Sequence, residues 1–277
     1  GKLYVNFDQE IFQLIREAKC LAKLGVEIPE AAKIVLLQEH QFKEYYDDMK
    51  YLLNEYEEVM DKVIPVTAKL LEPHIQTMEI KLRPGMITLT WTSMNIDAYK
   101  QHVQAGLKRL EELVVNINDI IENRIEKNLK IVSKTLLVDL PDSEAFTVEE
   151  FVRMQERWIS KQSTLLQGKN VEIDYAVRDL VSTIDSYKLD GQMDAVVDEE
   201  AFKLRKHYNH FMYQALLHCA KNSMNALKKR IGSRPEGNVV VQPFFEVDEC
   251  LVPGSKVINS PFLKILPSAS VSCFRSI

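Results

Sequence analysis

The sequence predicts an all-α fold of elongated, stacked helical bundles, with long bent helices and a short β segment near the C-terminus. Only 9 glycines and 10 prolines occur in 277 residues, which favours long regular elements. Apolar residues recur at spacings of three and four over long stretches, as they do in helices that bury one face. One segment, Arg83–Asp97, interrupts this pattern and therefore predicts a joint between two long helices.

The first predicted helix begins near Asp8 and ends near Gly25, since glycine readily adopts the backbone conformation that follows many helices. Its apolar positions share one face and are Ile11, Leu14, Ile15 and Ala18. Pro29 opens a second helix that we expect to continue to Val63, about 50 Å at ~1.5 Å per residue. Its apolar seam has coiled-coil spacing and comprises Phe42, Tyr45, Met49, Leu52, Tyr56, Val59 and Val63.

Two prolines follow in a segment that stays periodic as far as Leu82. Pro65 and Pro73 should each bend the helix, because proline lacks the backbone donor. Helical spacing resumes after the joint and continues towards Val132, through Tyr99, Val103, Leu107, Leu110, Val114, Ile117 and Ile121. Two long amphipathic helices joined by a turn are expected to fold back on each other.

The joint itself combines residues that disfavour a helix. Pro84 and Gly85 are expected to stop the preceding helix, since one lacks a donor and the other tolerates positive φ. Residues 86–92 are rich in β-branched and aromatic side chains, which favours extended backbone. Asn95 or Asp97 can then cap the next helix by accepting from its free N–H groups.

A second helical bundle is expected over residues 136–235, after a first bundle over 1–135. Thr147 and Glu150 have the form of a capping box at its start. The predicted helices run from there to Gly168, from Val171 to Tyr187, and from a cap at Asp198 to Gly232. The expected core positions are Phe151, Met154, Trp158 and Leu165 on the first helix, and Leu204, Tyr208, Phe211, Ala215 and Cys219 on the last.

The pattern changes again over residues 236–262, where we expect a short β segment. Its alternating apolar positions are Phe245, Val247 and Leu251, and Pro243 and Pro253 limit it to an edge strand. Residues 263–277 lack an acidic helix start, so we expect little order there and a truncated or alternatively spliced end. The first residue is glycine rather than methionine, which suggests a fragment of a longer chain.

Two motifs carry a resemblance to a known family. The Pro-Gly-x-x-x-Leu-x-Trp-x-Ser turn of the N-terminal tail of dynein heavy chains resembles the joint at Pro84, Gly85, Leu89, Trp91, Thr92, Ser93, Asn95 and Asp97. Upstream, the tail's "EAK…LG…IP" segment is similar to Ile15–Lys19, Leu24–Gly25 and Ile28–Pro29. The resemblance covers roughly residues 3–260. From Val5 to Cys20, the amino-acid sequence looks most like that of the axonemal heavy chains.

The resemblance implies a structural role. The tail of an axonemal heavy chain carries dynein intermediate and light chains, packs against other heavy chains and attaches the motor to its cargo microtubule through axonemal docking factors. It would place the chain in the cytoplasm, on the cytoskeleton of a cilium or flagellum. ATP hydrolysis belongs to distant motor modules of the family, and no phosphate-binding glycine motif occurs here, so we expect neither catalysis nor a cofactor.

Three histidines form the best candidate for a metal site. His207, His210 and His218 return to nearly the same face of the last helix, with Cys219 nearby. Helical zinc sites usually also need a ligand from another helix, and no H-E-x-x-H motif is present. The pattern therefore favours packed or solvated histidines over a metal-dependent enzyme, and we predict no metal ligands.

The remaining candidates have ordinary explanations. A basic cluster near the end of the last helix could bind an acidic partner; it comprises Lys228, Lys229, Arg230 and Arg234. Cations at a helix C-terminus also offset the helix dipole, and the net charge of −5 gives no general attraction to nucleic acid.

Trp91 and Trp158 could anchor a partner, although core packing is favoured for both. The cysteines are Cys20, Cys219, Cys250 and Cys273, whose spacing indicates free thiols; Cys20 and Cys219 fall on predicted apolar faces.

The composition bounds the alternatives. A hydrophobic fraction of 46% and a charged fraction of 27% are ordinary for a globular protein, and no apolar run approaches the ~20 residues that cross a bilayer. We therefore expect no membrane, nucleic-acid or small-molecule partner. A general spectrin-like or coiled-coil scaffold would explain the heptads, but not the Pro-Gly…Trp joint.

Overall fold

The structure, a computed structural model, describes residues 8–91, 93, 95–140, 146–187, 195–231, 245–248 and 262–265. These residues are overwhelmingly helical, and the all-α prediction is confirmed. The chain divides into two compact units, which are described separately: residues 1–120 with 179–204, and residues 121–178 with 205–277. The division into bundles at residue 135 stays a prediction.

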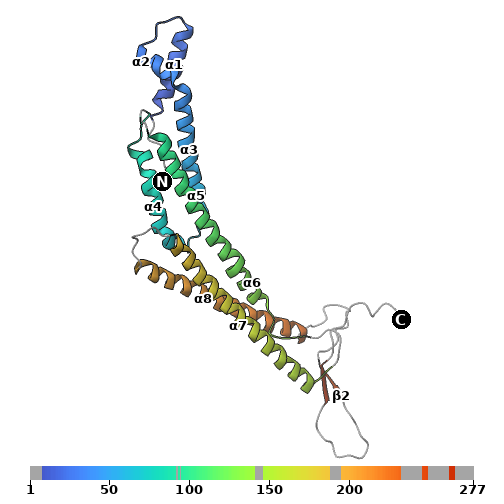
Figure 1. The fold of residues 1–277 in the computed structure, drawn as a ribbon. Coiled ribbons are helices and arrows are strands. Elements are labelled where there is room, and N and C mark those ends of the chain that lie inside the picture. Colours follow the sequence, from blue (N-terminus) through green and yellow to red (C-terminus); the bar gives the residue numbers. More distant parts are fainter. Residues whose placement is uncertain are drawn as a thin grey trace, which may run out of the picture. The chain divides into compact units, whose positions relative to one another are not determined.

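Five helices lie wholly within the described residues of the first unit, and Figure 1 labels each of them. They are α1 (Glu10–Lys23), α2 (Glu30–Leu37), α3 (Glu39–Asp61), α4 (Ala68–Ile87) and α5 (Ile96–Asp119). The single helix predicted from Pro29 to Val63 is wrong in one respect, because Gln38 leaves helical geometry and separates α2 from α3. This break lets α2 pack against α1, while α3 packs against α5.

The ends of α1 are fixed as the sequence predicts. The backbone N–H of Glu10 donates to Oδ1 of Asp8 at 2.9 Å, which satisfies one free donor of the first turn. Gly25 has a φ of +70°, and the N–H of Val26 donates to the carbonyl oxygen of Leu21 at 3.1 Å. A glycine in this conformation, with that bond across the helix end, is a Schellman motif.

The core of the first unit lies along α5, against which both α3 and α4 pack (Figure 1). The predicted faces are largely buried: Phe42, Met49, Leu52, Tyr56 and Val59 on α3, and Val103, Leu107, Leu110, Val114 and Ile117 on α5. Helix α4 contributes Leu70, Leu71, Met78 and Leu82. The periodic positions therefore identified the buried stripe of each helix, because a 3.6-residue period keeps such positions on one side.

The two prolines before the joint act differently from each other. Pro65 lies in the connection between α3 and α4, so it separates the two helices instead of bending one. Pro73 lies inside α4, as predicted. The hydroxyl of Thr77 donates to the carbonyl oxygen of Pro73 at 2.8 Å, one turn later.

Helix α5 is followed by a π-helical segment, η1 (Ile120–Glu126), and then by α6 (Lys127–Lys134). The predicted continuation towards Val132 is confirmed, but the change of helix type was not predicted. Ile121 and Ile125 are both buried in η1. Ile117, Ile121 and Ile125 are spaced by four, which fits an α-helix as well as a π segment, so the sequence contains no local signal for the wider turn.

The second unit contains α6, most of α7 (Val148–Ser186) and most of α8 (Ala195–Ile231). The capping box is confirmed: the Glu150 carboxylate accepts from the N–H of Thr147 at 3.0 Å. The predicted end at Gly168 is wrong, because α7 continues through it as one helix of 39 residues. Asp198 lies in the first turn of α8, which begins at Ala195, so it is not the cap.

Polar contacts connect α6 and the segment after it to α7 and α8. The hydroxyl of the buried Ser223 accepts from the N–H of Leu137 at 2.8 Å and donates to the carbonyl oxygen of Cys219 at 2.7 Å. The indole Nε1 of Trp158 donates to the carbonyl oxygen of Leu136 at 2.9 Å. These bonds satisfy backbone groups that would otherwise lack a partner where α6 ends.

The buried face of α8 differs from the predicted one at one position. Leu204, Tyr208, Ala215 and Cys219 are buried as expected, but Phe211 is 44% exposed and Met212 is buried in its place. Both choices fit a spacing of three and four, so periodicity alone could not distinguish them.

The described residues of the second unit also include three short strands. They are β1 (Phe146–Thr147), β2 (Phe245–Asp248) and β3 (Phe262–Ile265), in the antiparallel order β1-β3-β2. In β2 and β3, Phe245 lies opposite Ile265, and Asp248 opposite Phe262. The strand β3 lies partly in the range 263–277, where little order was expected, whereas Leu251 and most of 236–262 lie outside the described residues.

Candidate functional site

The predicted joint connects α4 to α5, and it begins differently from the prediction. Pro84 and Gly85 do not stop α4, which continues to Ile87. The carbonyl oxygen of Pro84 accepts from the N–H groups of Thr88 and Leu89, both at 2.9 Å. A proline removes only its own donor, so its carbonyl group can still close the last turn of the helix.

Gly85 is required for close packing and not for its backbone conformation. Its φ is not positive; among the described residues Gly25 alone has that feature. A Cβ atom at Gly85 would lie 2.3 Å from the hydroxyl oxygen of Tyr99. That hydroxyl donates to the carbonyl oxygen of Leu82 at 3.0 Å, and burial raises the pKa of Tyr99. The glycine therefore lets α5 approach the end of α4.

A tight turn replaces the expected extended segment. Ile87 is still helical, and Thr88 has helical-region angles of −114° and −30°. The N–H of Ser93 donates to the carbonyl oxygen of Thr90 at 3.0 Å, and the N–H of Thr90 donates to Oγ of Ser93, also at 3.0 Å. The joint is thus closed by reciprocal bonds, and Leu89 at its start is buried.

The start of α5 lies where the sequence predicted it. Asn95 occupies the N-cap position, but its side chain makes no cap hydrogen bond. Asp97 lies in the first turn, where a carboxylate is favoured by the helix dipole. Ile96 is fully buried. Thr92 lies outside the described residues.

Trp91 connects the joint to the beginning of the described chain. Its indole Nε1 donates to the carbonyl oxygen of Asp8 at 3.1 Å. Its ring meets the ring of Phe12 on α1 edge-on, with centroids 5.5 Å apart, and that of Phe42 on α3 at 5.3 Å. Such edge-to-face pairs are favourable beyond the area they bury. Trp91 therefore packs α1, α3 and the joint together.

A groove that the sequence did not predict lies between α3 and α4. Its volume is about 900 Å³. It is lined by Tyr56, Glu57, Met60 and Asp61 from α3, and by Gln76, Glu79, Ile80, Leu82, Arg83 and Met86 from α4. Tyr56 donates a hydrogen bond to Glu79 across it at 3.2 Å. Burial, with the Glu79 carboxylate, raises the pKa of Tyr56 to about 12.

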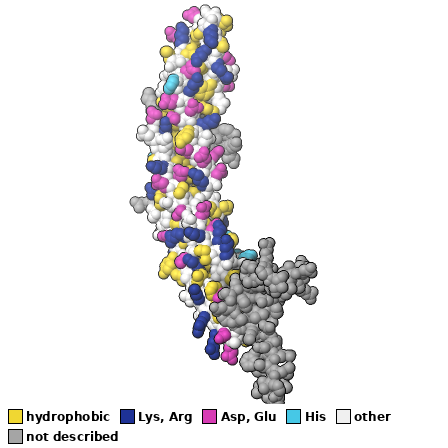
Figure 2. Space-filling view, turned by 90° about the vertical axis from the view of Figure 1, so that its right-hand side faces the viewer, with side chains coloured by type: hydrophobic (Ala, Val, Ile, Leu, Met, Phe, Trp, Pro, Cys, Tyr) yellow, Lys and Arg dark blue, Asp and Glu magenta, His cyan; other side chains and the backbone are white. Residues whose placement is uncertain are grey.

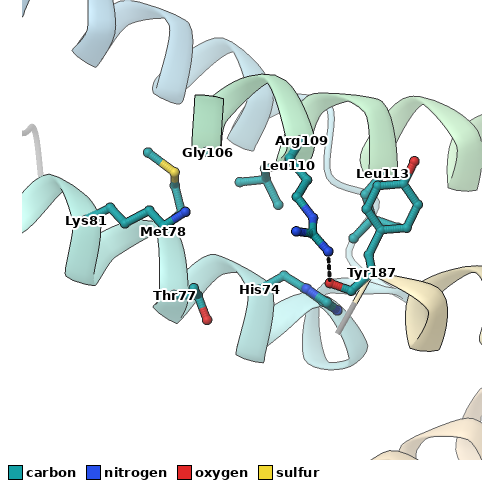
Figure 3. A pocket seen from close by; sticks show the side chains of 9 residues that line it. All are labelled: His74, Thr77, Met78, Lys81, Gly106, Arg109, Leu110, Leu113 and Tyr187. Atoms are coloured by element: carbon teal, nitrogen blue, oxygen red, sulfur yellow. Dashed lines mark hydrogen bonds between the residues drawn. The ribbon is translucent and has the colours of Figure 1, made fainter. Parts of the chain in front are cut away.

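A smaller cavity, of about 50 Å³, lies between α4 and α5 (Figure 3). Gly106 forms part of its wall, and a Cβ there would lie 2.9 Å from Sδ of Met78. Figure 3 shows Arg109 directed at the end of α7, where its guanidinium donates to the carbonyl oxygen of Tyr187 at 3.1 Å. This contact fixes the end of α7 against α5.

The three histidines of the possible metal site lie on α8 with different neighbours. The His207 ring packs against the Phe211 ring, with the ring centroids 4.7 Å apart. Burial, and then the nearby His210, lowers the pKa of His207. His210 lies 3.3 Å from the amide nitrogen of Gln214, and His218 is exposed. Across the described parts of the chain, no group of three or more His, Cys, Asp or Glu residues is placed to hold a metal ion.

The side chains of the basic cluster, the cysteines and Trp158 differ in how far they are exposed to solvent. Lys228 and Lys229 are exposed, whereas the side chain of Arg230 and all of Arg234 lie outside the described residues. Cys20 is exposed, contrary to prediction, while Cys219 is buried and its pKa is raised by that burial. Trp158 is partly exposed, with Lys161 placed 5.7 Å from its ring centroid.

The surface carries charges of both signs. Figure 2 shows Lys and Arg interspersed with Asp and Glu on the face in view. No helix among the described residues has the length and apolar character required to span a membrane.

Comparison with known proteins identifies the family. A family model described as "Dynein heavy chain, N-terminal region 1" matches residues 1–99. The "Dynein gamma chain, flagellar outer arm" of Chlamydomonas reinhardtii is 40% identical to this chain over 280 aligned residues, which cover 100% of it. The chain belongs to the dynein heavy chain family.

Other axonemal dynein heavy chains are also similar. "Dynein axonemal heavy chain 5" of Mus musculus is 30% identical over 83% of this chain, and "Dynein axonemal heavy chain 8" of Homo sapiens is 34% identical over 67%. The dynein segment covers 6%, 6% and 4%, respectively, of the lengths of these three relatives. These similarities place it on the cytoskeleton, at the axoneme of a cilium or flagellum.

Proposed function

We propose that this segment is part of the non-catalytic tail of an axonemal dynein heavy chain and acts as a scaffold in assembly of the dynein complex. Its partners would be dynein intermediate and light chains, other heavy chains and axonemal docking factors. In this proposal the parent heavy chain supplies the ATP-driven motor elsewhere, and the segment supports microtubule-based ciliary movement by holding subunits in place.

The observation that carries the proposal is the way the joint is fixed. Trp91 bonds to Asp8 and packs on Phe12 and Phe42, so the α4–α5 turn, α1 and α3 form one packed body. A helix that is held along its length by neighbours resists bending and can transmit force. A scaffold requires this property, whereas an enzyme requires a cleft with reactive groups in suitable positions.

The eight joint residues have a structural role in this proposal. Gly85 permits contact with Tyr99, Ser93 closes the turn and Leu89 is buried beneath it. Together they would set the angle at which α5 returns along α4. We also propose that residues 1–135 and 136–235 act as successive bundles, with partner surfaces on the exposed helix faces.

The test is a pull-down of purified dynein intermediate chains with the 277-residue chain. We expect binding that is abolished when exposed positions of α3 are charged, as in Tyr51→Lys with Asn54→Lys. Val152→Lys on α7 is the matched control, because Val152 is also exposed, at 47%. A folded, helical chain that binds no intermediate chain would overturn the proposed intermediate-chain partner.

A further inference from the structure

The α3–α4 groove runs beside a stretch of α4 that is long enough to receive a short helix. Helices α3 and α4 each pack along α5, but between them the surface is hollowed over about 900 Å³. The groove follows α4 from Gln76 to Met86. At ~1.5 Å per residue this is about 15 Å, which corresponds to almost three turns of an additional helix. A helix placed there would complete a four-helix arrangement.

The wall of the groove is apolar where a helix would touch it. Met60, Ile80, Leu82 and Met86 line it, and the side chain of Ile80 is 67% exposed. Methionine-lined grooves suit the apolar face of an amphipathic helix, because the flexible thioether adapts to the side chains it meets. The exposed Ile80 is therefore the expected centre of the contact.

The charge of the lining selects the kind of helix. The described lining includes three carboxylates, Glu57, Asp61 and Glu79, and one cation, Arg83. Among the ion pairs of the described residues, none includes Glu57 or Asp61. Carboxylates without an ion pair in the lining favour a partner with Lys or Arg beside its apolar face and disfavour an acidic one.

We propose that this groove binds an amphipathic helix of a partner protein, with an apolar ridge of Leu, Ile or Met flanked by Lys or Arg. This inference rests on the proposed scaffold function, since it assigns one docking site to the scaffold. The two are separable, because subunit binding through other surfaces would persist if the groove were unoccupied.

The test uses two labelled synthetic peptides of about 18 residues, a length that favours a stable helix. Both have Leu at heptad positions a and d; one has Lys at e and g, and the other has Glu. Their binding to the 277-residue chain is followed by fluorescence anisotropy at two salt concentrations. We expect the Lys peptide to bind, more weakly at high salt, and the Glu peptide to bind at least about tenfold less tightly.

Variants locate the site. Ile80→Glu should lower the affinity for the Lys peptide by about tenfold or more, because it places an uncompensated charge against the apolar ridge. Val115→Glu is its control, since Val115 is 49% exposed on α5 and outside the groove. Glu57→Lys should weaken binding roughly threefold and reduce the salt dependence. Glu58→Lys, the same change one residue later and outside the lining, should not.

Four outcomes would overturn the proposal. One is equal binding of both peptides, and another is an affinity that Ile80→Glu and Val115→Glu change equally. The third is a chain that dimerises in sedimentation experiments and becomes monomeric on Ile80→Glu, which would make a second copy the occupant. Failure of the peptide test with intact intermediate-chain binding would reject the groove and keep the scaffold. Circular dichroism of each variant establishes that it is folded.

Discussion

The indole Nε1 of Trp91 donates a hydrogen bond to the backbone carbonyl oxygen of Asp8, 3.1 Å away and 83 positions earlier in the chain. Asp8 in turn accepts from the first turn of α1 through its side chain. One indole thus connects the α4–α5 turn to the start of α1. The joint is therefore a packing centre of the first unit as well as a connection.

Replacing Trp91 should loosen α1 before it affects the rest of the unit. We expect Trp91→Phe to lower the free energy of unfolding by about 1 kcal/mol, because the hydrogen bond to Asp8 is lost. Trp91→Ala should lower it by about 3 kcal/mol, because packing on Phe12 and Phe42 is also lost. Amide hydrogen exchange measures this directly, and α1 should exchange faster in both variants. Unchanged exchange in α1 would show that Trp91 does not hold it.

A methyl group at Gly85 should be poorly tolerated. We expect Gly85→Ala to destabilise the chain by about 1–3 kcal/mol, since the new Cβ would lie 2.3 Å from the Tyr99 hydroxyl oxygen. Removing that oxygen in Tyr99→Phe should reduce the cost of the alanine. Urea unfolding of the two single variants and the double variant measures the coupling. Additive effects would contradict the proposed contact.

An alanine at Gly168 should have the opposite effect on stability to an alanine at Gly85. It lies inside α7, and a Cβ there would meet nothing within 4 Å. Alanine loses less backbone freedom than glycine in a helix, so Gly168→Ala should stabilise the chain by about 1 kcal/mol. Thermal unfolding followed by circular dichroism tests this. A lower melting temperature would indicate a contact that the structure lacks.

Alkaline pH should weaken the contact that Tyr56 on α3 makes with Glu79 on α4. Its pKa is raised from an ordinary value near 10 to about 12, chiefly by burial and then by Glu79. Because the folded pKa is the higher one, this contribution is complete below pH 10 and is lost as the pH rises through about 12. The Tyr56→Phe variant should therefore lose less stability than the parent over that range.

The control for this titration is Tyr175→Phe on α7, where the side chain is 60% exposed. Denaturant unfolding at several pH values gives the comparison. If Tyr56→Phe and Tyr175→Phe changed the pH dependence equally, burial of Tyr56 would not be the cause.

The sequence was most informative where one property repeats along a helix. The buried faces that include Met49 on α3 and Val114 on α5 were predicted because many apolar residues along each helix follow the same helical spacing. Single residues were less informative. Gly85 was interpreted from local rules as a stop, but its environment is set by Tyr99 on the next helix. Gly168 was treated as a helix end, yet the neighbouring turns continue through it.

The candidate site was only partly predictable for the same reason. The joint was found because it breaks the helical pattern, but nothing local indicates that Trp91 meets Asp8. The groove arises from the distance between α3 and α4, which depends on how both pack on α5. An apolar residue such as Ile80 could have indicated the groove, but its exposure is known only once the packing of the helices is known.

Chemical cross-linking with mass spectrometry, applied to the parent dynein complex purified from axonemes, tests the scaffold proposal most directly. Lysines on the first unit, such as Lys50 on α3 and Lys69 on α4, report on its surroundings. We predict cross-links from them to an intermediate chain, a light chain or a second heavy chain. Cross-links to their own heavy chain alone, in a sample whose other subunits are linked to one another, would contradict the scaffold function.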